Sequence, residues 1–243
     1  MTKSIPVFFM LLVSAAILHA EPFPESFHVF RETVYMQNTP LLEVMRLYTQ
    51  AKADVEKVFS NENGLSGVDL YTSLSRCEYL MGLSFQVEGK KNEAAAFYEQ
   101  GIVWAEESLA RQPTSEGFRL LGTNISLLCG ARRSYALSNF GKIEENANKA
   151  MDLNPQNFAA LYLIGARYVA APWPFSNVRK GLSLLEKITT QNTEAMEKED
   201  RFNLYLMLEL ASIKLKRNED AQMWHEKAAS LYPTNNFISV LLK

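Results

Sequence analysis

Apolar residues recur with helical spacing along most of the chain, from about Pro40 onward, and strand patterns are scarce. Thr39-Pro40 is a suitable helix start, because proline is preorganised for the first helical turn, and we expect that helix to run to about Ser60. The segment 61–67 is expected to be a loop. Residues 21–38 are aromatic and irregular and fit no regular element. The pattern therefore predicts an all-α protein.

Two helix endings in the chain are nearly the same. Lys149 to Pro155 reads KAMDLNP, and Lys227 to Pro233 reads KAASLYP. In both, an alanine and a leucine of an amphipathic face precede a proline, which ends the helix. An ending that recurs at a distance indicates a repeat array.

Small and large residues alternate in a characteristic order in the region that begins at Ser75. The small, aromatic and turn positions are Gly82, Phe85, Gly89, Ala94, Tyr98 and Gly101. Small residues at these intervals let two antiparallel helices approach closely, and the aromatic rings fill the space between them. This order resembles the tetratricopeptide repeat (TPR), a helix-turn-helix unit. The resemblance implies a solenoid of helical hairpins that binds partners and rarely catalyses.

Laying the same register along the chain predicts a TPR-like helical domain over 39–243. Its units are expected near 75–108, 117–157, 158–195 and 202–235. The Pro40 helix is expected to cap the first unit, because the end of a solenoid otherwise exposes apolar surface. The second unit is less regular, with its turn expected three residues late, at Asn139-Phe140-Gly141. The acidic run from Glu194 to Asp200 is interpreted as a solvated linker before the fourth unit.

The first twenty residues have the layout of a secretory signal peptide. Lys3 gives a minimal positive start, Ile5 to Leu18 is apolar apart from Ser14, and Ala20 is a small residue at the expected cleavage site. We therefore predict residues 1–20 as a signal peptide, and a periplasmic or secreted protein that does not span the membrane after cleavage. An uncleaved anchor is the alternative.

Charge and cysteine content narrow the classes of function. The full chain carries 25 basic and 27 acidic residues, a net charge of −2, which does not favour a nucleic-acid partner. Cys77 and Cys129 are the only cysteines in the sequence. In an exported chain they can form one disulfide, or they can be two buried small apolar residues on different helices.

In TPR proteins the first helix of each unit lines a concave groove, and the resemblance places particular residues there. The polar groove positions are Arg76, Tyr79, Gln86, Arg132, Tyr135 and Asn203. The apolar ones are Leu83, Leu128, Leu163, Ala166, Val169, Leu206 and Leu210. Arginine and tyrosine suit a peptide terminus or a small organic acid. The alternative is that the apolar residues are interhelical core and the arginines are solvated.

A second candidate site is the inserted segment from Ala171 to Asn177. Its two prolines stiffen it, and Trp173 and Phe175 stand where a plain repeat has a short polar turn. An aromatic pair on a surface loop suits a partner protein. The alternative is that both rings fold back over the helix ends.

No catalytic motif, metal-spaced His/Cys cluster or phosphate loop occurs in the sequence, so we predict a protein that is not an enzyme and has no cofactor or metal. The leading hypothesis is an exported binding or adaptor protein with a protein partner. More narrowly, the chain is similar to the periplasmic TPR proteins associated with TRAP-type transporters, which implies oligomerisation and a small hydrophobic or acidic ligand held for a transport partner. The second hypothesis is a pure protein–protein scaffold of the cell envelope.

Overall fold

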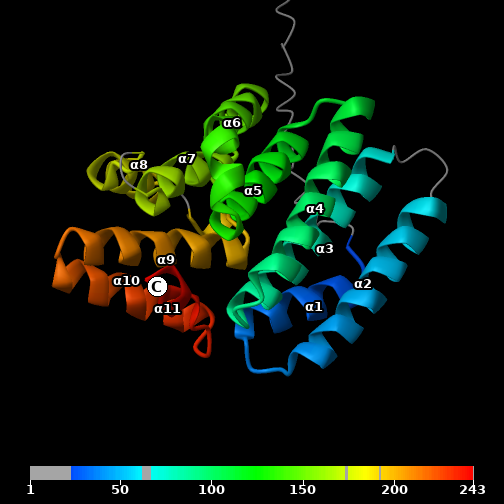
Figure 1. The fold of residues 1–243 in the computed structure, drawn as a ribbon, viewed down its shortest axis with the longest axis horizontal. Helices are drawn as coiled ribbons and strands as arrows, with labels where there is room; N and C mark the ends of the chain where they lie inside the picture. Colours follow the sequence, from blue (N-terminus) through cyan, green and yellow to red (C-terminus); the bar gives the residue numbers. More distant parts are fainter. Residues whose placement is uncertain (1–22, 62–66, 173–174, 192, 243) are drawn as a thin grey trace, which may run out of the picture.

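The computed structural model describes residues 23–61, 67–172, 175–191 and 193–242. These residues form α-helices and one short 3-10 helix, Thr193–Ala195, with no strand among them. The helices, labelled as in Figure 1, are α1 (Glu25–Met36), α2 (Leu41–Asn61), α3 (Gly67–Val87), α4 (Lys91–Arg111), α5 (Ser115–Ala131), α6 (Arg133–Leu153), α7 (Phe158–Ala170), α8 (Val178–Thr189), α9 (Lys198–Lys214), α10 (Asn218–Leu231) and α11 (Phe237–Leu241). The predicted all-α class is confirmed.

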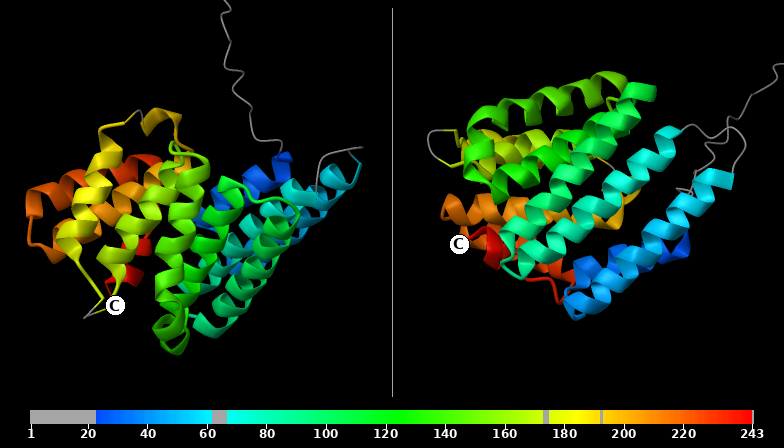
Figure 2. Two further views of the ribbon diagram at one scale, coloured as in Figure 1. Left: turned by 90° about the horizontal axis from the view of Figure 1, so that it is seen from above. Right: turned by 45° about the vertical axis from the view of Figure 1, so that its right-hand side comes forward.

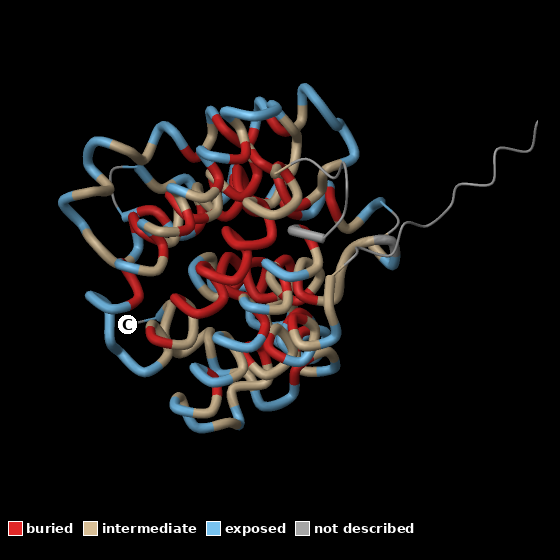
Figure 3. The backbone as a smooth tube through the Cα atoms, turned by 90° about the vertical axis from the view of Figure 1, so that its right-hand side faces the viewer, coloured by how far each residue is buried: buried red, intermediate tan, exposed pale blue. Residues whose placement is uncertain are grey.

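Consecutive helices pack as hairpins, α3 with α4, α5 with α6, α7 with α8 and α9 with α10. Each hairpin also packs on the next one along the chain, so the array is a TPR-like solenoid, as predicted (Figure 1). The buried residues follow its interior, and exposed residues lie around the outside (Figure 3). This order arises because each hairpin buries its apolar face only against its neighbours.

The first hairpin shows why small residues recur at fixed positions. A Cβ atom at Gly82 would lie 2.3 Å from Cε1 of the Tyr98 ring on the facing helix α4. The Tyr98 ring is fully buried, and its hydroxyl donates a 2.7 Å hydrogen bond to Gln86 Oε1. Gly89, in the turn between the two helices, has a φ of +73°, which glycine adopts without steric cost.

The segment predicted to be irregular, 21–38, is largely helical, and that prediction was wrong. Helix α1 buries Phe27, Phe30 and Val34, which recur at helical spacing on one face. Pro24 precedes the helix and accepts the first backbone hydrogen bonds through its carbonyl oxygen. The short length of the helix and its many aromatic residues hid this spacing in the sequence.

Helix α2 corresponds to the helix expected from Pro40, and a buried carboxylate attaches it to α3. Lys52 Nζ lies 2.8 Å from Glu78 Oε1, and the Tyr48 hydroxyl donates to the same carboxylate at 3.0 Å. The Glu78 residue is only 1% exposed, so its charge requires these partners. The cap therefore rests on a specific polar contact as well as on apolar packing.

The two ends of the array meet through aromatic rings. The Tyr35 ring of α1 stacks on Tyr232, with the ring centroids 5.0 Å apart, and meets Phe202 of α9 edge-on. Asn235 Nδ2 donates to the Tyr35 carbonyl oxygen at 2.6 Å. Figure 2 shows the N-terminal helices beside the C-terminal segment. Helix α1 therefore joins the beginning of the solenoid to its end.

The second hairpin turns earlier than the sequence pattern predicted. Helix α5 ends at Ala131, Arg132 is extended (φ −127°, ψ 105°), and α6 runs without a break through Asn139-Phe140-Gly141. The Asn139 side chain donates to the Tyr135 carbonyl oxygen one helical turn back, so it does not end the helix. The expected turn at Asn139-Phe140-Gly141 is wrong by a full two turns of helix, and Tyr135 belongs to α6.

The acidic run before the fourth hairpin is not a solvated linker throughout. Helix α9 begins at Lys198, and Glu199 in its first turn is 1% exposed. Burial of this carboxylate is made tolerable by Arg31 of the distant helix α1, a partner that local sequence cannot reveal. Cys77 and Cys129 are both free and buried, on α3 and α5.

Candidate functional site

The first helices of the four hairpins enclose a cavity that we call the groove cavity. It has a volume of about 170 Å³, and α3, α5, α7 and α9 form most of its wall. Helices α1 and α11 also contribute to its wall, through Tyr35, Phe237 and Leu241. The lining residues are Tyr35, Tyr79, Leu83, Gln86, Thr123, Ser126, Leu127, Gly130, Tyr162, Leu163, Ala166, Ala170, Asn203, Leu206, Met207, Phe237 and Leu241.

Two tyrosine hydroxyls on this wall make no hydrogen bond to another described residue. Tyr79 and Tyr162 line the cavity, and neither hydroxyl has a hydrogen-bond partner among the described residues. Burial raises the pKa of both phenols above the ordinary value, so they are neutral donors at physiological pH. Tyr35 differs, because its hydroxyl accepts a 2.9 Å hydrogen bond from Asn203 Nδ2. The cavity is thus an apolar space with unused hydroxyl donors.

The structure brings together half of the polar residues predicted for the groove. Tyr79, Gln86 and Asn203 line the groove cavity, together with the predicted apolar residues Leu83, Leu163, Ala166 and Leu206. The predicted core alternative applies to Leu128, Val169 and Leu210, which are buried and do not line it. Whether the polar residues bind a partner stays a prediction.

Arg132 and Tyr135 lie away from the groove cavity, because the turn comes earlier than predicted. Arg132 is the residue between α5 and α6, and its guanidinium pairs with Glu99 of α4. Tyr135 is half-buried in the first turn and a half of α6. A register error within one hairpin therefore moved both residues out of the predicted site.

Arg76 is held in an ionic cluster beside the groove. Its Nη2 lies 3.0 Å from Glu116 Oε1 of α5, and its Nη1 lies 3.2 Å from Glu197 Oε1 at the start of α9. We define the ionic cluster as three arginines and four acids, which are Arg31, Arg76, Arg119, Glu116, Glu197, Glu199 and Asp200. Four helices, α1, α3, α5 and α9, meet there.

The other arginines complete the cluster. Arg31 Nη1 lies 2.8 Å from Glu199 Oε1, and Arg119 Nε donates to Glu116 Oε2 at 2.7 Å. His28 adjoins Arg31, and burial lowers the pKa of its imidazole, so it adds no positive charge at neutral pH. The cluster therefore joins the N-terminal helix to the last hairpin through charges.

Burial acts on three acids of the cluster, Glu116, Glu199 and Asp200, and they titrate differently because the arginines offset it to different extents. Burial opposes ionisation of Glu116, but the adjacent Arg119 and Arg76 outweigh it and lower its pKa to about 2. Burial raises the pKa of Asp200 to about 6, and it raises that of Glu199 well above its usual range. The excess negative charge in a poorly solvated place favours retention of a proton.

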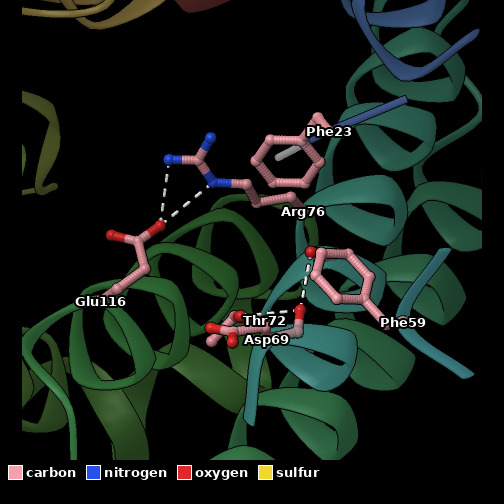
Figure 4. Close-up of a pocket in the computed structure, with 7 residues that line it drawn as sticks. Phe23, Phe59, Asp69, Thr72, Arg76 and Glu116 are labelled. Atoms are coloured by element: carbon pink, nitrogen blue, oxygen red, sulfur yellow. Dashed lines mark hydrogen bonds and ion pairs between the residues drawn. The ribbon is translucent and has the colours of Figure 1, made fainter. Parts of the chain in front are cut away.

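A small hollow of about 110 Å³ adjoins Arg76 and contains both apolar and polar side chains (Figure 4). The Phe23 ring lies over the Arg76 guanidinium, 5.4 Å from ring centroid to Cζ. This hollow does not offer the Arg76 guanidinium to a ligand, because that group is already paired with two carboxylates. Its role is to pack the N-terminal segment on α3.

The predicted partner loop is described only in part. Trp173 lies outside the described residues. Phe175 is 48% exposed, and its ring centroid lies 5.9 Å from that of Phe140 on α6. The ring therefore contacts a neighbouring helix and remains half accessible.

Sequence reasoning missed several residues of the groove cavity. Tyr162 lies one position before the predicted Leu163, and its apolar neighbours gave no reason to select it. Tyr35, Phe237 and Leu241 come from terminal helices that no TPR register includes. The aromatic residues of 21–38 were the one sequence feature that pointed to these missed residues, and they did not show where in the fold the segment packs.

No group of three or more His, Cys, Asp or Glu side chains is placed to hold a metal ion in the part of the chain that the structure describes. Among those same residues, no helix is both long enough and apolar enough to cross a membrane.

Comparison with known proteins adds little to this geometry. No protein-family model matches the chain, and no curated protein matches it. The crystal structure of YrrB, described as a TPR protein with an unusual peptide-binding site, is similar with 17% identity and a TM-score of 0.36, over 91% of this chain and 96% of YrrB. Because these values are low, the assignment of a TPR-like helical solenoid rests on the helix packing of this chain itself.

Proposed function

We propose that this chain is a non-enzymatic adaptor that docks a partner protein at the groove cavity. The observation that carries the proposal is an apolar cavity at the meeting of four hairpins, with the unused hydroxyls of Tyr79 and Tyr162 on its wall. Protein interfaces concentrate their binding energy in such desolvated pockets, which take one anchor side chain of the partner.

The size of the cavity favours an anchor side chain over a small molecule. Its volume of about 170 Å³ is below the range of ~300–1,000 Å³ that is usual for small-molecule sites. An aromatic or aliphatic side chain fits this space, and a neighbouring carbonyl of the partner can accept hydrogen bonds from the two tyrosines. We therefore propose a large apolar residue of a partner protein as the occupant.

Export and transport are further parts of the proposal. The signal peptide, residues 1–20, lies outside the described residues, so a periplasmic or secreted location stays a prediction from the sequence. The narrower resemblance to TRAP-associated TPR proteins, with its transport partner and oligomer, likewise stays a prediction. The alternative predicted from the sequence, a pure scaffold of the cell envelope, would bind its partners through the loop that contains Trp173 and would hold no small ligand.

The test is to obstruct the groove cavity with a side chain and to compare a matched substitution elsewhere. Thr123 lines the cavity, and its hydroxyl donates to the carbonyl oxygen one turn back, at Arg119. Thr49 makes the same kind of bond, to Met45, on the exposed face of α2. Thr123→Trp blocks the cavity, and Thr49→Trp adds an equal ring outside it.

Proteins captured from host extract by the unmodified chain and by both variants are compared by quantitative mass spectrometry. We expect at least one protein to be recovered with the unmodified chain and Thr49→Trp and lost with Thr123→Trp. Equal melting temperatures show that the variants are folded. Recovery of every captured protein by Thr123→Trp would show that the groove cavity is not the docking site.

A further inference from the structure

A second and larger cavity lies at the edge of the solenoid, and we call it the edge cavity. It has a volume of about 840 Å³, between the end of α5, the first two turns of α6 and the end of α7. Lys214 at the end of α9 and Phe175 also line it. This volume falls within the ~300–1,000 Å³ that is usual for small-molecule sites, unlike that of the groove cavity.

One part of the wall of the edge cavity is apolar and uncovered. Phe140 and Phe175 face each other with ring centroids 5.9 Å apart, and Ala136 and Ala170 extend the same surface. Leu137 is 77% exposed and Phe175 is 48% exposed. Large apolar side chains grouped at a hollow indicate a surface that something else covers.

The charged residues on the wall are all cations. Arg133, Arg167 and Lys214 line the edge cavity, and no aspartate or glutamate does so among the described residues. The charge of Arg167 is compensated by an ion pair, because its Nη1 lies 2.7 Å from Glu144 Oε2. It also lies over the Phe140 ring, 4.8 Å from Cζ to the centroid. Arg167 is therefore a fixed part of the wall, and its charge is already compensated.

The two other cations have no carboxylate partner in the described part of the chain. Arg133 makes no ion pair or side-chain hydrogen bond there. Lys214 Nζ donates only to the Val169 carbonyl oxygen, at 2.8 Å. Burial lowers the pKa of the Lys214 ammonium, which agrees with the absence of a compensating acid. The cavity thus has a net positive charge beside an apolar surface.

We propose that the edge cavity binds a small amphipathic carboxylate, with its carboxylate between Arg133 and Lys214 and its apolar body against Phe140 and Phe175. Charge complementarity selects an anion, and the uncovered aromatic surface selects one with an apolar body. The volume of about 840 Å³ favours a small molecule over a protein segment. This ligand site goes beyond the partner site proposed above, because the two cavities have different walls except for Ser126, Gly130 and Ala170.

The probe is decanoate, and its matched control is the uncharged decanamide, each titrated into the full chain by calorimetry at fixed salt. We expect one decanoate per chain and at least tenfold weaker binding of decanamide. The double variant Arg133→Gln/Lys214→Gln should weaken decanoate at least tenfold and leave decanamide binding unchanged. Both positions are exposed, so the variant should fold, which its melting temperature verifies.

The charge-matched control is Arg179→Gln/Lys187→Gln on α8, where both residues are exposed and have no ion pair among the described residues. It should bind decanoate as the unmodified chain does. Equal affinity for decanoate and decanamide would overturn the proposal, and so would equal weakening by the two double variants or no binding at all. The Thr123→Trp variant should still bind decanoate, so failure of this proposal is distinguishable from failure of the groove proposal.

Discussion

Cationic side chains have different roles in the ionic cluster and at the edge cavity. In the ionic cluster three guanidinium groups pair with the carboxylates of Glu116, Glu197 and Glu199, and Arg76 alone contacts two of them. At the edge cavity Arg133 and Lys214 meet no carboxylate among the described residues. Cations therefore join helices in the cluster, and Arg133 and Lys214 leave charge available at the edge cavity.

The difference indicates how to recognise a binding cation in a helical solenoid. A buried cation whose donors are all taken by carboxylates of other helices is part of the folded structure, because its removal leaves those carboxylates uncompensated. A cation beside an apolar hollow with no acid contributes little to stability and retains its charge for a ligand. The comparison predicts large stability effects at the cluster and small ones at the edge cavity.

The largest effect is expected for Arg76→Met. Methionine preserves much of the apolar contact of the side chain but leaves Glu116 and Glu197 without one of their cations. Removal of one partner from a fully buried ion pair costs ~3–5 kcal/mol. Because the Glu116 and Glu197 side chains stay 36% and 29% exposed, we expect a smaller loss, ~2–3 kcal/mol, in the free energy of unfolding. Urea titration followed by circular dichroism at pH 7 measures it.

The control for that prediction is Arg46→Met. Arg46 pairs with Glu43 on the exposed face of α2, three residues away, where water screens the charges. We expect no measurable change. If the two methionine variants are equally stable, Arg76 does not hold the helices together and the comparison fails.

The sequence predicted the hairpins well and the ionic cluster not at all. The spacing of Gly82, Phe85 and Tyr98 depends on contacts within one hairpin, and such contacts leave a periodic trace in the chain. Arg31 and Glu199, by contrast, lie 168 positions apart in the sequence and meet only because the solenoid curves back on itself. No local pattern records that meeting.

The residues of the candidate sites could be predicted only in those hairpins where the helix-turn-helix register was predicted correctly. Tyr79, Gln86 and Asn203 line the groove cavity because the helix-turn-helix register holds in the first and fourth hairpins. Arg132 and Tyr135 do not, because Asn139 bonds back to the Tyr135 carbonyl oxygen and lets the helix continue. The edge cavity arises from that same early turn, which places the beginning of α6 beside the end of α7.

A smaller effect is expected from pH, through Asp200. Its pKa is raised to about 6 in the folded chain from an ordinary value near 3.8, so the folded state binds more protons between those values. Stability therefore falls as pH rises from about 4 to 6, by about 2 kcal/mol. Asp200→Asn should reduce this fall and leave the part that comes from Glu199, whose pKa is also raised, and urea titrations of both proteins from pH 4 to 7 measure the difference.

Through Glu116, stability depends on pH in the opposite direction, so the effects of Glu116 and Asp200 can be distinguished. Because the pKa of Glu116 is lowered to about 2, its contribution is complete above the ordinary value of 4.5 and is lost as pH falls toward 2. The Asp200→Asn variant should keep this loss at low pH. Identical slopes for the variant and the unmodified chain between pH 4 and 6 would contradict a raised pKa at Asp200.

The smallest effect is expected for Lys214→Met at the edge cavity. The substitution removes a cation that no described carboxylate offsets and one hydrogen bond to the Val169 carbonyl oxygen, so the two consequences oppose each other. We expect the free energy of unfolding at pH 7 to change by less than ~1 kcal/mol, less than for Arg76→Met.

Because the pKa of the Lys214 ammonium is lowered in the folded chain, its unfavourable burial is present at pH 7 and is relieved as pH rises toward 10.5. The unmodified chain should therefore gain stability relative to Lys214→Met as the buffer is raised from pH 7 to 10, and urea titrations at both pH values measure that gain. A loss as large as that of Arg76→Met would show that Lys214 holds the fold together, and the distinction between joining cations and binding cations would not hold for this protein.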